Sequence, residues 1–530
     1  MMNLGLISKK INNLFDLLGR DKNTKALNAN FPKLNFSISG DRIILVETQQ
    51  PLPNQVALAK FLPVAMEFFT AKVVAYSMLR GGPIDSMKQW LRHRFSFLAR
   101  VSTRKHVTFN ARIRNNSRYQ LFLDDFLSKN PSKRDLEEMF YRGVQIGDLI
   151  YDLYLRNSKK MTVDFADHFF RVRFLEVLEY FDKAYDFIEK NDVAAICVSH
   201  TVYHFAIPAR IGVSKGIEVF LVNHESIYRI DSKFPYAFTD FKEYKTLLAE
   251  FLAKDIVPSR ELARSRLNRR VSGEVVDMPY FTNKSPFSSE KSEVSLKPKR
   301  KLRVLVLLHD FFDSPHVYGE TFFPDFLEWL KFLENISIHT DYEWLLKPHP
   351  NALQDPTNQL REIFSHVSAF NFVDASFSNN SLKDLGIDVA LTVYGSVAHE
   401  LPYMGIPVIN ASLNNPHAEF SFSYTPDSLE KYRETLLDLE NFRHEILMDE
   451  ILDYYFIHYL FNLNSWLIRD YDSLLREIGG YKSLFDHNFV DVVAKSDYLL
   501  DDLALEHAIL SFLKSDSVRI SRSNFEGFRN

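Results

Sequence analysis

Hydrophobic positions along the chain fall into two blocks in which short apolar runs alternate with helix-like stretches. In the first block, apolar runs typical of buried strands lie at 41–48, 72–78, 193–200 and 217–226. Between them, apolar residues recur at helical spacing over 55–71, 134–156 and 167–190. Because a strand buried on both faces reads as a continuous apolar run, this alternation predicts a parallel α/β sheet.

The second block repeats the pattern after a stretch rich in Pro, Ser and Lys at 274–300, which we interpret as a linker. Its expected strands lie at 301–310, 342–351, 370–374, 387–393 and 407–412, with a helix at 322–336. The pattern is helical from about 427 to 515. The predicted fold class is therefore α/β, with two Rossmann-like domains in tandem and additional C-terminal helices. The expected divisions are a lead-in at 1–40, an N-terminal domain at 41–285, a C-terminal domain at 286–425 and a helical region at 426–530.

Composition narrows the class of protein. The 530 residues are 46% hydrophobic with a net charge of −4, so nothing marks a nucleic-acid-binding protein. Cys197 is the single cysteine, which excludes an intramolecular disulfide and a cysteine-based zinc site. The spacing of apolar residues over 1–20 predicts an amphipathic helix rather than a signal peptide, and no apolar run in the sequence is long enough to cross a bilayer. We expect a cytoplasmic protein, and the amphipathic helix leaves peripheral association with the inner face of the membrane open.

Polar residues gather where doubly wound sheets place ligands, just after the strand ends of the second domain. The sequence KPHP places Lys347 and His349 in a loop stiffened by two prolines, which suits a phosphate; a plain surface turn is the alternative. The sequence HDFFDSPHVYG begins with His309 and Asp310 and includes Ser314. Its His and Asp residues also leave a metal site open.

A third group of candidate residues lies at the start of a predicted helix. Gly395 and Ser396 stand where free backbone N–H groups and the helix dipole can receive a phosphate. Glu400, one turn further, is placed to accept hydrogen bonds from ribose hydroxyls. Gly405 and Pro407 return the chain to the sheet. An ordinary strand–helix connection explains these residues equally well when they are considered alone.

Together with KPHP, the spacing Glu400, Gly405, Pro407 resembles that of bacterial GT-B glycosyltransferases of the capsule-polysaccharide-biosynthesis group, which includes Kdo transferases and CDP-glycerol glycerophosphotransferases. The resemblance covers about 303–412 by motif and 41–230 by architecture only. It implies the GT-B type of fold, no metal and no cofactor besides a nucleotide-sugar substrate. It also assigns donor binding to these second-domain residues: Lys347, His349, Gly395, Ser396, Glu400, His309, Asp310 and Ser314.

The first domain should then bind the acceptor and supply a catalytic base. Glu225 or His224 is the first choice for the base, with Glu47 behind them, because each lies at an expected strand end. Arg229, Arg210 and His200 are candidates for holding an anionic acceptor. Structural hydrogen bonding is the alternative for each residue.

The resulting hypothesis is a glycosyltransferase that moves a sugar or glycerol phosphate from a nucleotide-activated donor to a growing bacterial surface polysaccharide or lipid-linked glycan. A cleft between the two domains would hold both substrates. The sequence leaves two alternatives open, a UDP-sugar 2-epimerase on the same fold and a non-catalytic component of a polysaccharide assembly complex.

Overall fold

The computed structural model describes residue 25 and residues 41–48, 51–81, 83–95, 105–111, 117–277, 285–288, 301–350, 352–382, 384–462, 465–495 and 498–525. The expected N-terminal amphipathic helix and most of the expected linker lie outside these residues. The chain forms two compact units. One comprises Met1–Leu153, Phe165–Ala237 and Leu463–Asn530, and the other Tyr154–Asp164 and Phe238–Asn462.

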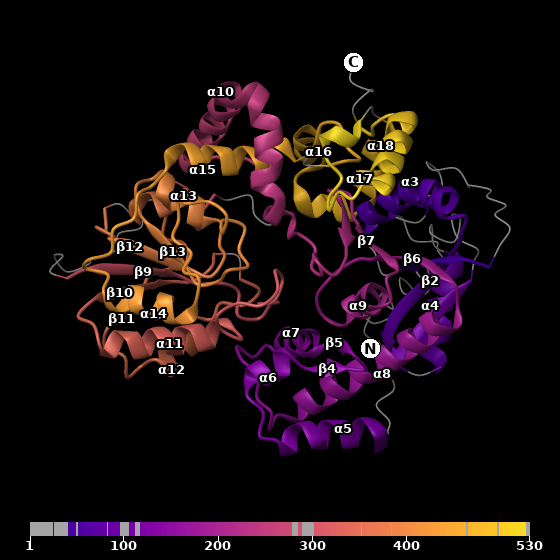
Figure 1. Cartoon of the computed structure of the whole chain (residues 1–530), viewed down its shortest axis with the longest axis horizontal. Helices are drawn as coiled ribbons and strands as arrows, with labels where there is room; N and C mark the ends of the chain where they lie inside the picture. The colour runs from indigo at the N-terminus through magenta and orange to yellow at the C-terminus, as the bar shows by residue number, and fades with distance from the viewer. Residues whose placement is uncertain are drawn as a thin grey trace, which may run out of the picture. The chain divides into compact units, whose positions relative to one another are not determined.

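The first unit contains a six-stranded sheet with the strand order β3-β2-β1-β6-β7-β8. Figure 1 labels β2, β6 and β7 of this sheet. Its strands are β1 (Ile43–Glu47), β2 (Lys72–Arg80), β3 (His106–Ala111), β6 (Val193–Val198), β7 (Glu218–Val222) and β8 (Ile227–Ile230). All neighbours pair in parallel except β7 and β8. The helices of this part of the chain are α3 (Leu52–Phe69), α4 (Pro83–Phe95), α5 (Ser117–Ser128), α8 (His168–Lys190) and α9 (Ile207–Ser214). The four apolar runs of this block predict β1, β2, β6 and β7, and none of them predicts β3 or β8.

The expected continuous helix over 134–156 is wrong. The structure has α6 (Lys133–Glu137), a hairpin of β4 (Phe140–Tyr141) and β5 (Val144–Gln145), and then α7 (Gly147–Ser158). Arg142 and Gly143 connect the two short strands, and both have positive φ angles, 50° and 80°. That combination is typical of a two-residue hairpin turn and is incompatible with a right-handed helix.

The second unit contains a five-stranded, fully parallel sheet with the order β11-β10-β9-β12-β13. Its strands are β9 (Arg303–Leu307), β10 (Glu343–Lys347), β11 (Phe370–Phe372), β12 (Val389–Thr392) and β13 (Val408–Asn410). The accompanying helices include α11 (Phe326–Ile338), α12 (Thr357–Ile363), α13 (Val397–Tyr403) and α14 (Leu429–Leu437). The same unit contains α10 (Tyr244–Val271), which packs on α15 (Met448–Tyr455).

In chain order both sheets have the Rossmann arrangement 3-2-1-4-5, which the first sheet extends by β8. The predicted fold class, two Rossmann-like α/β domains in tandem with additional C-terminal helices, is confirmed. In such sheets the chain reverses its direction of winding beside the first strand, and ligands bind outside the carboxyl ends of the strands at that switch point. The switch points here lie between β1 and β6 and between β9 and β12.

The last helices of the chain complete the core of the first unit. These are α16 (Tyr471–Ile478), α17 (His487–Lys495) and α18 (Asp502–Lys514), and α18 packs on α3. Trp466, Leu474 and Phe512 are buried in one cluster with Val56 of α3 and Phe220 of β7. No helix among the described residues has the length and apolarity that crossing a bilayer requires.

Candidate functional site

The switch point of the second sheet is organised around His309, two residues after the end of β9. Its Nε2 atom lies 3.1 Å from Thr392 Oγ1 and accepts the N–H of Val393 at 3.2 Å. Its ring stacks on Phe326 with the centroids 4.7 Å apart. Burial lowers the pKa of His309 to about 3, so the imidazole is neutral and Nε2 is an acceptor. His309 therefore joins the ends of β9 and β12.

Asp310 links two of the sequence-predicted loops. One carboxylate oxygen accepts the N–H of Phe312 at 3.0 Å, and the other accepts the N–H of Leu353 at 2.7 Å. The HDFFDSPHVYG loop is thereby tied to the loop that follows KPHP. Ser314 is half-buried in the same loop, and its N–H donates to Asp313, which also pairs with Arg156 at 3.3 Å.

Lys347 is the last residue of β10 and is 3% exposed. Its Nζ atom lies 3.4 Å from the carbonyl oxygen of Ala375. Burial lowers the pKa of Lys347 to about 8, while the negative charges of Glu400 and Asp374 oppose that shift. His349, two residues further, is exposed. The strand end thus holds a nearly buried cation beside an accessible imidazole.

The N-terminus of α13 is less open than the sequence suggests. The N–H of Gly395 donates to Thr392 Oγ1 at 3.2 Å, and a Cβ at this position would lie 2.9 Å from the same oxygen. Glycine is therefore required by the close approach of Thr392. Ser396 is half-buried at the N-cap position, and its hydroxyl does not cap the helix.

Glu400 is buried and forms an ion pair with Arg270 of α10, whose Nε donates to Glu400 Oε1 at 2.7 Å. The same guanidinium reaches the carbonyl oxygen of Val276 at 3.3 Å. Sequence reasoning missed Arg270, because it lies 130 residues from Glu400 and on a different helix, so no local spacing relates the two. The predicted contact of Glu400 with ribose stays a prediction, and any ligand there would meet a carboxylate that already holds Arg270.

At the switch point of the first sheet, Glu47 ends β1 with its side chain fully buried. Its Oε2 atom accepts the N–H of Ser199, just after β6, at 2.8 Å. Its Oε1 atom has no hydrogen-bond partner among the described residues. Burial raises the pKa of Glu47 to about 7. Ser199 Oγ lies 2.7 Å from Nδ1 of the exposed His200, so the sheet brings Glu47 and His200 to the same strand ends.

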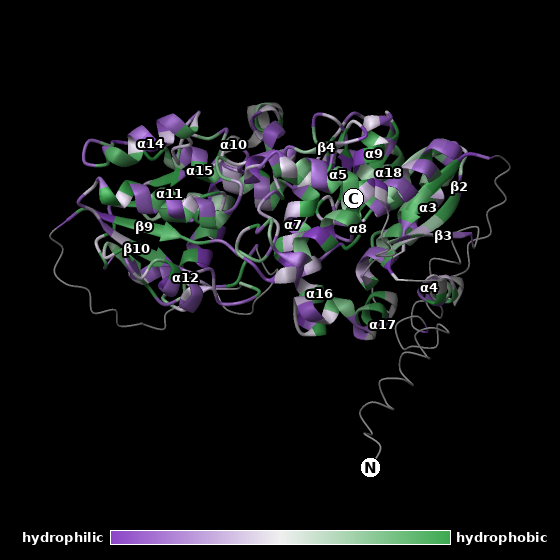
Figure 2. Cartoon of the chain, turned by 90° about the horizontal axis from the view of Figure 1, so that it is seen from below, coloured by the Kyte–Doolittle hydropathy of each residue, from purple (hydrophilic) through white to green (hydrophobic). Residues whose placement is uncertain are grey.

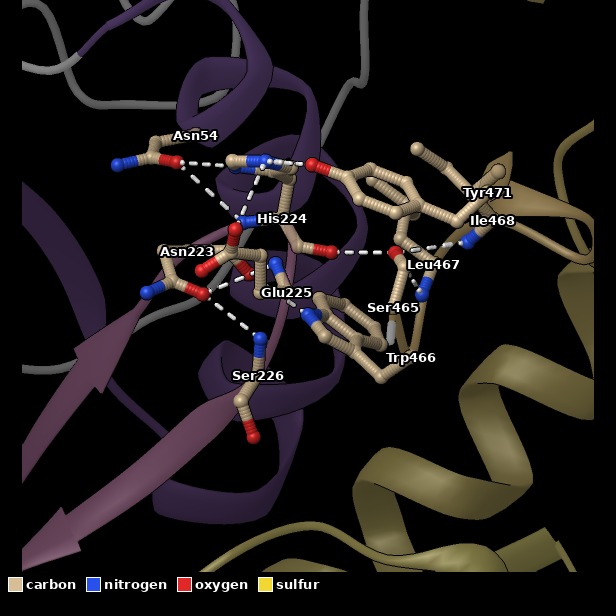
Figure 3. Close-up of polar contacts among 10 residues, drawn as sticks. All are labelled: Asn54, Asn223, His224, Glu225, Ser226, Ser465, Trp466, Leu467, Ile468 and Tyr471. Carbon is tan, nitrogen blue, oxygen red and sulfur yellow. Dashed lines mark hydrogen bonds and ion pairs between the residues drawn. The ribbon is translucent and has the colours of Figure 1, made fainter. Parts of the chain in front are cut away.

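His224 and Glu225 lie together in the turn between β7 and β8 (Figure 3). Both ring nitrogens of His224 are engaged: Nδ1 lies 3.1 Å from Asn54 Oδ1, and Nε2 lies 3.0 Å from the hydroxyl of Tyr471. Burial lowers the pKa of His224 to about 3. This neutral, doubly bonded imidazole links α3 to α16.

Glu225 is partly exposed, and its Oε1 atom lies 3.8 Å from Nε2 of His224. Desolvation raises the pKa of Glu225 to about 7, against the opposing charge of Arg519. Its backbone is fixed from both sides, because its N–H donates to Asn223 at 2.9 Å and its carbonyl accepts the N–H of Trp466 at 3.2 Å (Figure 3).

The two arginines expected at the acceptor site are engaged elsewhere in the first unit. Arg210 is buried in an ion pair with Asp148 at 2.5 Å and lies over the ring of Tyr236. Arg229 pairs with Glu218 and donates to carbonyl oxygens at the end of α18, among them that of Ser515 at 3.0 Å. Cations at a helix C-terminus stabilise its unpaired carbonyls and its dipole. Both side chains therefore have structural partners.

Among the described residues, no group of three or more His, Cys, Asp and Glu side chains is arranged to hold a metal ion. The predicted donor residues gather at the carboxyl ends of β9, β10 and β12. In the first unit, Glu47 and His200 share a switch point, whereas Arg210 and Arg229 do not join them.

No protein-family model and no curated protein sequence matches the chain. A structure of Thermosulfurimonas dismutans KpsC, a β-Kdo 2,4 transferase, shares 11% identity over 49% of this chain and 79% of that chain, with a TM-score of 0.30. The UDP-GlcNAc 2-epimerase of Neisseria meningitidis shares 11% identity over 78% of this chain and 97% of its own, with a TM-score of 0.24. These likenesses are distant, and the Rossmann strand orders above rest on the chain's own strand pairings.

Proposed function

We propose that the chain is a metal-independent glycosyltransferase of GT-B type that transfers a sugar, or glycerol phosphate, from a nucleotide-activated donor to a bacterial surface polysaccharide. The observation that carries the proposal is Lys347. An ammonium group is rarely buried without a charged or strongly hydrogen-bonding partner, because desolvation costs several kcal/mol. Among the described residues its one hydrogen-bond acceptor is a carbonyl oxygen 3.4 Å away.

A donor phosphate would satisfy this cation. Lys347 lies at the carboxyl end of β10, next to the strand pair that forms the switch point. Glu400, the nearest buried carboxylate on α13, already holds Arg270. A diphosphate would give the Lys347 ammonium an acceptor at hydrogen-bond distance, and a charge-assisted hydrogen bond to phosphate stabilises the leaving group during transfer.

The acceptor hydroxyl requires a base whose pKa lies near the working pH. Glu47 and Glu225 meet that condition, since burial raises the pKa of each to about 7. His224 does not, because its pKa is about 3 and both ring nitrogens are engaged. We assign the base to one of the two glutamates, in a protein working in the cytoplasm at the inner face of the membrane.

A thermal-shift screen with CMP, CDP, UDP, GDP and their sugars tests the proposal. A ligand at a hundredfold excess over its Kd stabilises the folded state by about 2.7 kcal/mol. We expect one nucleotide to raise the melting temperature of the native chain and of Lys331→Met, which alters an exposed lysine on α11, but not that of Lys347→Met. No response to any nucleotide would contradict the proposal.

The raised pKa values of Glu47 and Glu225 also suit proton transfer at a sugar carbon, as in a UDP-sugar 2-epimerase. Incubation of the protein with the stabilising nucleotide sugar, without acceptor, separates the two activities. A transferase leaves the sugar configuration unchanged, whereas epimerised nucleotide sugar would replace the transferase assignment. A non-catalytic binding component would show neither reaction. If Lys347→Ala and His349→Ala both left nucleotide binding and polymer production intact, the assignment of the donor site would be wrong.

A further inference from the structure

The Glu47 carboxyl and the Tyr76 hydroxyl belong to facing residues in the buried part of the first sheet. Glu47 and Tyr76 are direct neighbours in the parallel pair of β1 and β2, so their side chains project from the same face of the sheet. Both residues are 0% exposed. Figure 2 shows that β2 is mainly hydrophobic. Two polar side chains therefore lie side by side in apolar surroundings.

One polar atom of each side chain has no hydrogen-bond partner. Glu47 Oε1 and the Tyr76 hydroxyl oxygen are buried, and neither has a partner among the described residues. The rest of each side chain is fixed. Glu47 Oε2 accepts the N–H of Ser199 at 2.8 Å, and the Tyr76 ring packs on Phe109 of β3 with the centroids 5.4 Å apart. Because a buried polar atom without a partner costs free energy, two such atoms on facing residues point to each other as partners.

The charge of the Glu47 carboxyl is not balanced by a cation. Among the described residues its hydrogen bonds come from Ser199, and no Lys, Arg or His side chain forms an ion pair with it. The titratable groups near the pair are Cys197 on β6 and His200, whose ring contacts Ser199. Burial raises the pKa of Cys197, so its thiol stays neutral. Burial, and then the negative charge of Glu47, raise the pKa of Tyr76, so the two groups are close enough to interact.

We propose that Tyr76 is a positioning residue for Glu47, with its hydroxyl bonded to Glu47 Oε1 in both protonation states of the carboxyl. A hydroxyl donates to an ionised carboxylate and, after rotation of its hydrogen, accepts from a protonated carboxyl. Neighbouring strands lie about 4.8 Å apart, so rotation of the side chains is enough to bring the two oxygens together. The bond keeps the carboxyl in one place while its proton comes and goes. The acid–base role of the pair rests on the proposed function, whereas the hydrogen bond does not.

Infrared spectroscopy of the full chain tests the bond without any substrate. Ordinary carboxyls are ionised above about pH 6, so a band of protonated carboxyl above that pH belongs to a group with a raised pKa, and Glu47→Gln identifies the band of Glu47. In the native chain this band should disappear with a midpoint at about pH 7. The hydroxyl bonds more strongly to the ionised carboxylate than to the neutral acid. Tyr76→Phe should therefore raise the midpoint by about one pH unit and move the band to higher wavenumber.

A buried tyrosine of the second unit provides the control for the infrared measurement. The Tyr432 hydroxyl accepts the indole N–H of Trp329 at 3.0 Å, and Tyr432→Phe should change neither the midpoint nor the band of Glu47. If Tyr76→Phe also left both unchanged, the inference would be overturned. A native band at the wavenumber of an unbonded carboxylic acid would overturn it as well, and that measurement needs no variant of Tyr76 to fold.

The role of the bond in catalysis is measured separately, as the pH profile of transfer. If Glu47 is the base, the pH at which kcat/KM reaches half of its plateau should rise in Tyr76→Phe by the same shift as the infrared midpoint, and Tyr432→Phe should follow the native profile. An infrared shift with an unchanged pH profile would overturn the role of the pair in catalysis. Absence of transfer by the native chain would contradict the proposed function, and the infrared result would still decide whether the hydrogen bond exists.

Discussion

At the scale of single residues, burial sets the protonation of the groups at the strand ends. It raises the pKa of the Glu47 carboxyl to about 7, lowers that of the Lys347 ammonium to about 8 and lowers that of the His309 imidazole to about 3. In each case the low-dielectric interior favours the neutral form. A neutral His309 can hold two strand ends together, whereas Lys347 and Glu47 change charge in the range where an enzyme works.

The charge of Lys347 should make donor binding pH-dependent. The ammonium form exists below its pKa of about 8, so affinity for a nucleoside diphosphate should fall as the pH rises above that value. Isothermal titration at pH 7 and pH 9.5 should show binding weaker by about tenfold at the higher pH. Lys347→Arg, which stays charged, should retain affinity at both. If Lys347→Arg lost as much affinity as the native chain between pH 7 and pH 9.5, the titrating group would be a residue other than Lys347.

Glu47 should reduce stability as the pH rises. The carboxyl of the unfolded chain loses its proton near the ordinary glutamate pKa of 4.5 and that of the folded chain near 7, so the folded state binds more protons between these values. The stabilisation that the Glu47 carboxyl contributes is fully present below pH 4.5 and is lost as the pH rises through 7. Glu47→Gln does not titrate and should gain up to about 3 kcal/mol relative to the native chain between pH 4.5 and pH 8. Urea unfolding at each pH, followed by hydrogen exchange and mass spectrometry of peptides from β1 and β6, measures the difference in stability between the two proteins.

The exposed Glu67 provides the matched control for that comparison. Glu67→Gln should have the same stability as the native chain at every pH, because the Glu67 side chain is in contact with water in both the folded and the unfolded state. If Glu47→Gln also followed the native chain, the carboxyl would be solvated in solution and Glu47 would lose its case as a base.

At the scale of elements, the connection from α6 to α7 contains two glycines, each of which is required for a different physical reason. Gly143 has a φ of 80° in the turn of the hairpin, with open space where a Cβ would lie. Gly147 begins α7, and a Cβ there would lie 1.7 Å from the carbonyl oxygen of Leu136. The first glycine is required by backbone conformation and the second by a backbone contact.

Alanine at these two positions should therefore have unequal effects. Gly143→Ala incurs only the left-handed strain, about 1 kcal/mol. Gly147→Ala forces α6 and α7 apart and should lose more, about 2–3 kcal/mol. Thermal unfolding of the two variants shows which of them loses more stability. Equal losses would mean that the α6–α7 contact relaxes without cost.

At the scale of the whole molecule, the first unit is assembled from stretches at both ends of the chain. Residues from Trp466 to Phe512 fill the same core as α3 and the strands β1, β6 and β7. The turn at His224 is attached to this segment through Tyr471, and Ser465 donates to the carbonyl oxygen of His224 (Figure 3). The second sheet has its own core.

A chain that ends at residue 462 should consequently lose the first unit selectively. Removing buried side chains from a shared core exposes the apolar face of α3 to water. Hydrogen exchange should accelerate by about tenfold or more in β1, β6 and β7, and protection in β9, β10 and β12 should persist. Unchanged protection of the first sheet would mean that the C-terminal helices add little to its stability.

The hydrophobic pattern alone predicted the strands of both sheets except β3 and β8, because strands buried on both faces need continuous apolar runs whatever surrounds them. It also located the polar residues at the strand ends, including Lys347 and Glu47, since the end of a run is visible in one dimension. The pattern gave a wrong prediction over 134–156, because the helical spacing of apolar residues continues through the hairpin. The hairpin is marked by the positive φ angles of Arg142 and Gly143, which the apolar pattern does not show.

Tertiary structure decided which polar residues are available. Arg229 reads as a surface cation, yet it binds carbonyls of a helix almost 300 residues later, and Glu400 meets Arg270 from another helix. His224 looks like a base until Asn54 and Tyr471 engage both its nitrogens. Partners so distant in sequence leave no local pattern, while the burial that shifts each pKa exists only once the sheets and helices have packed.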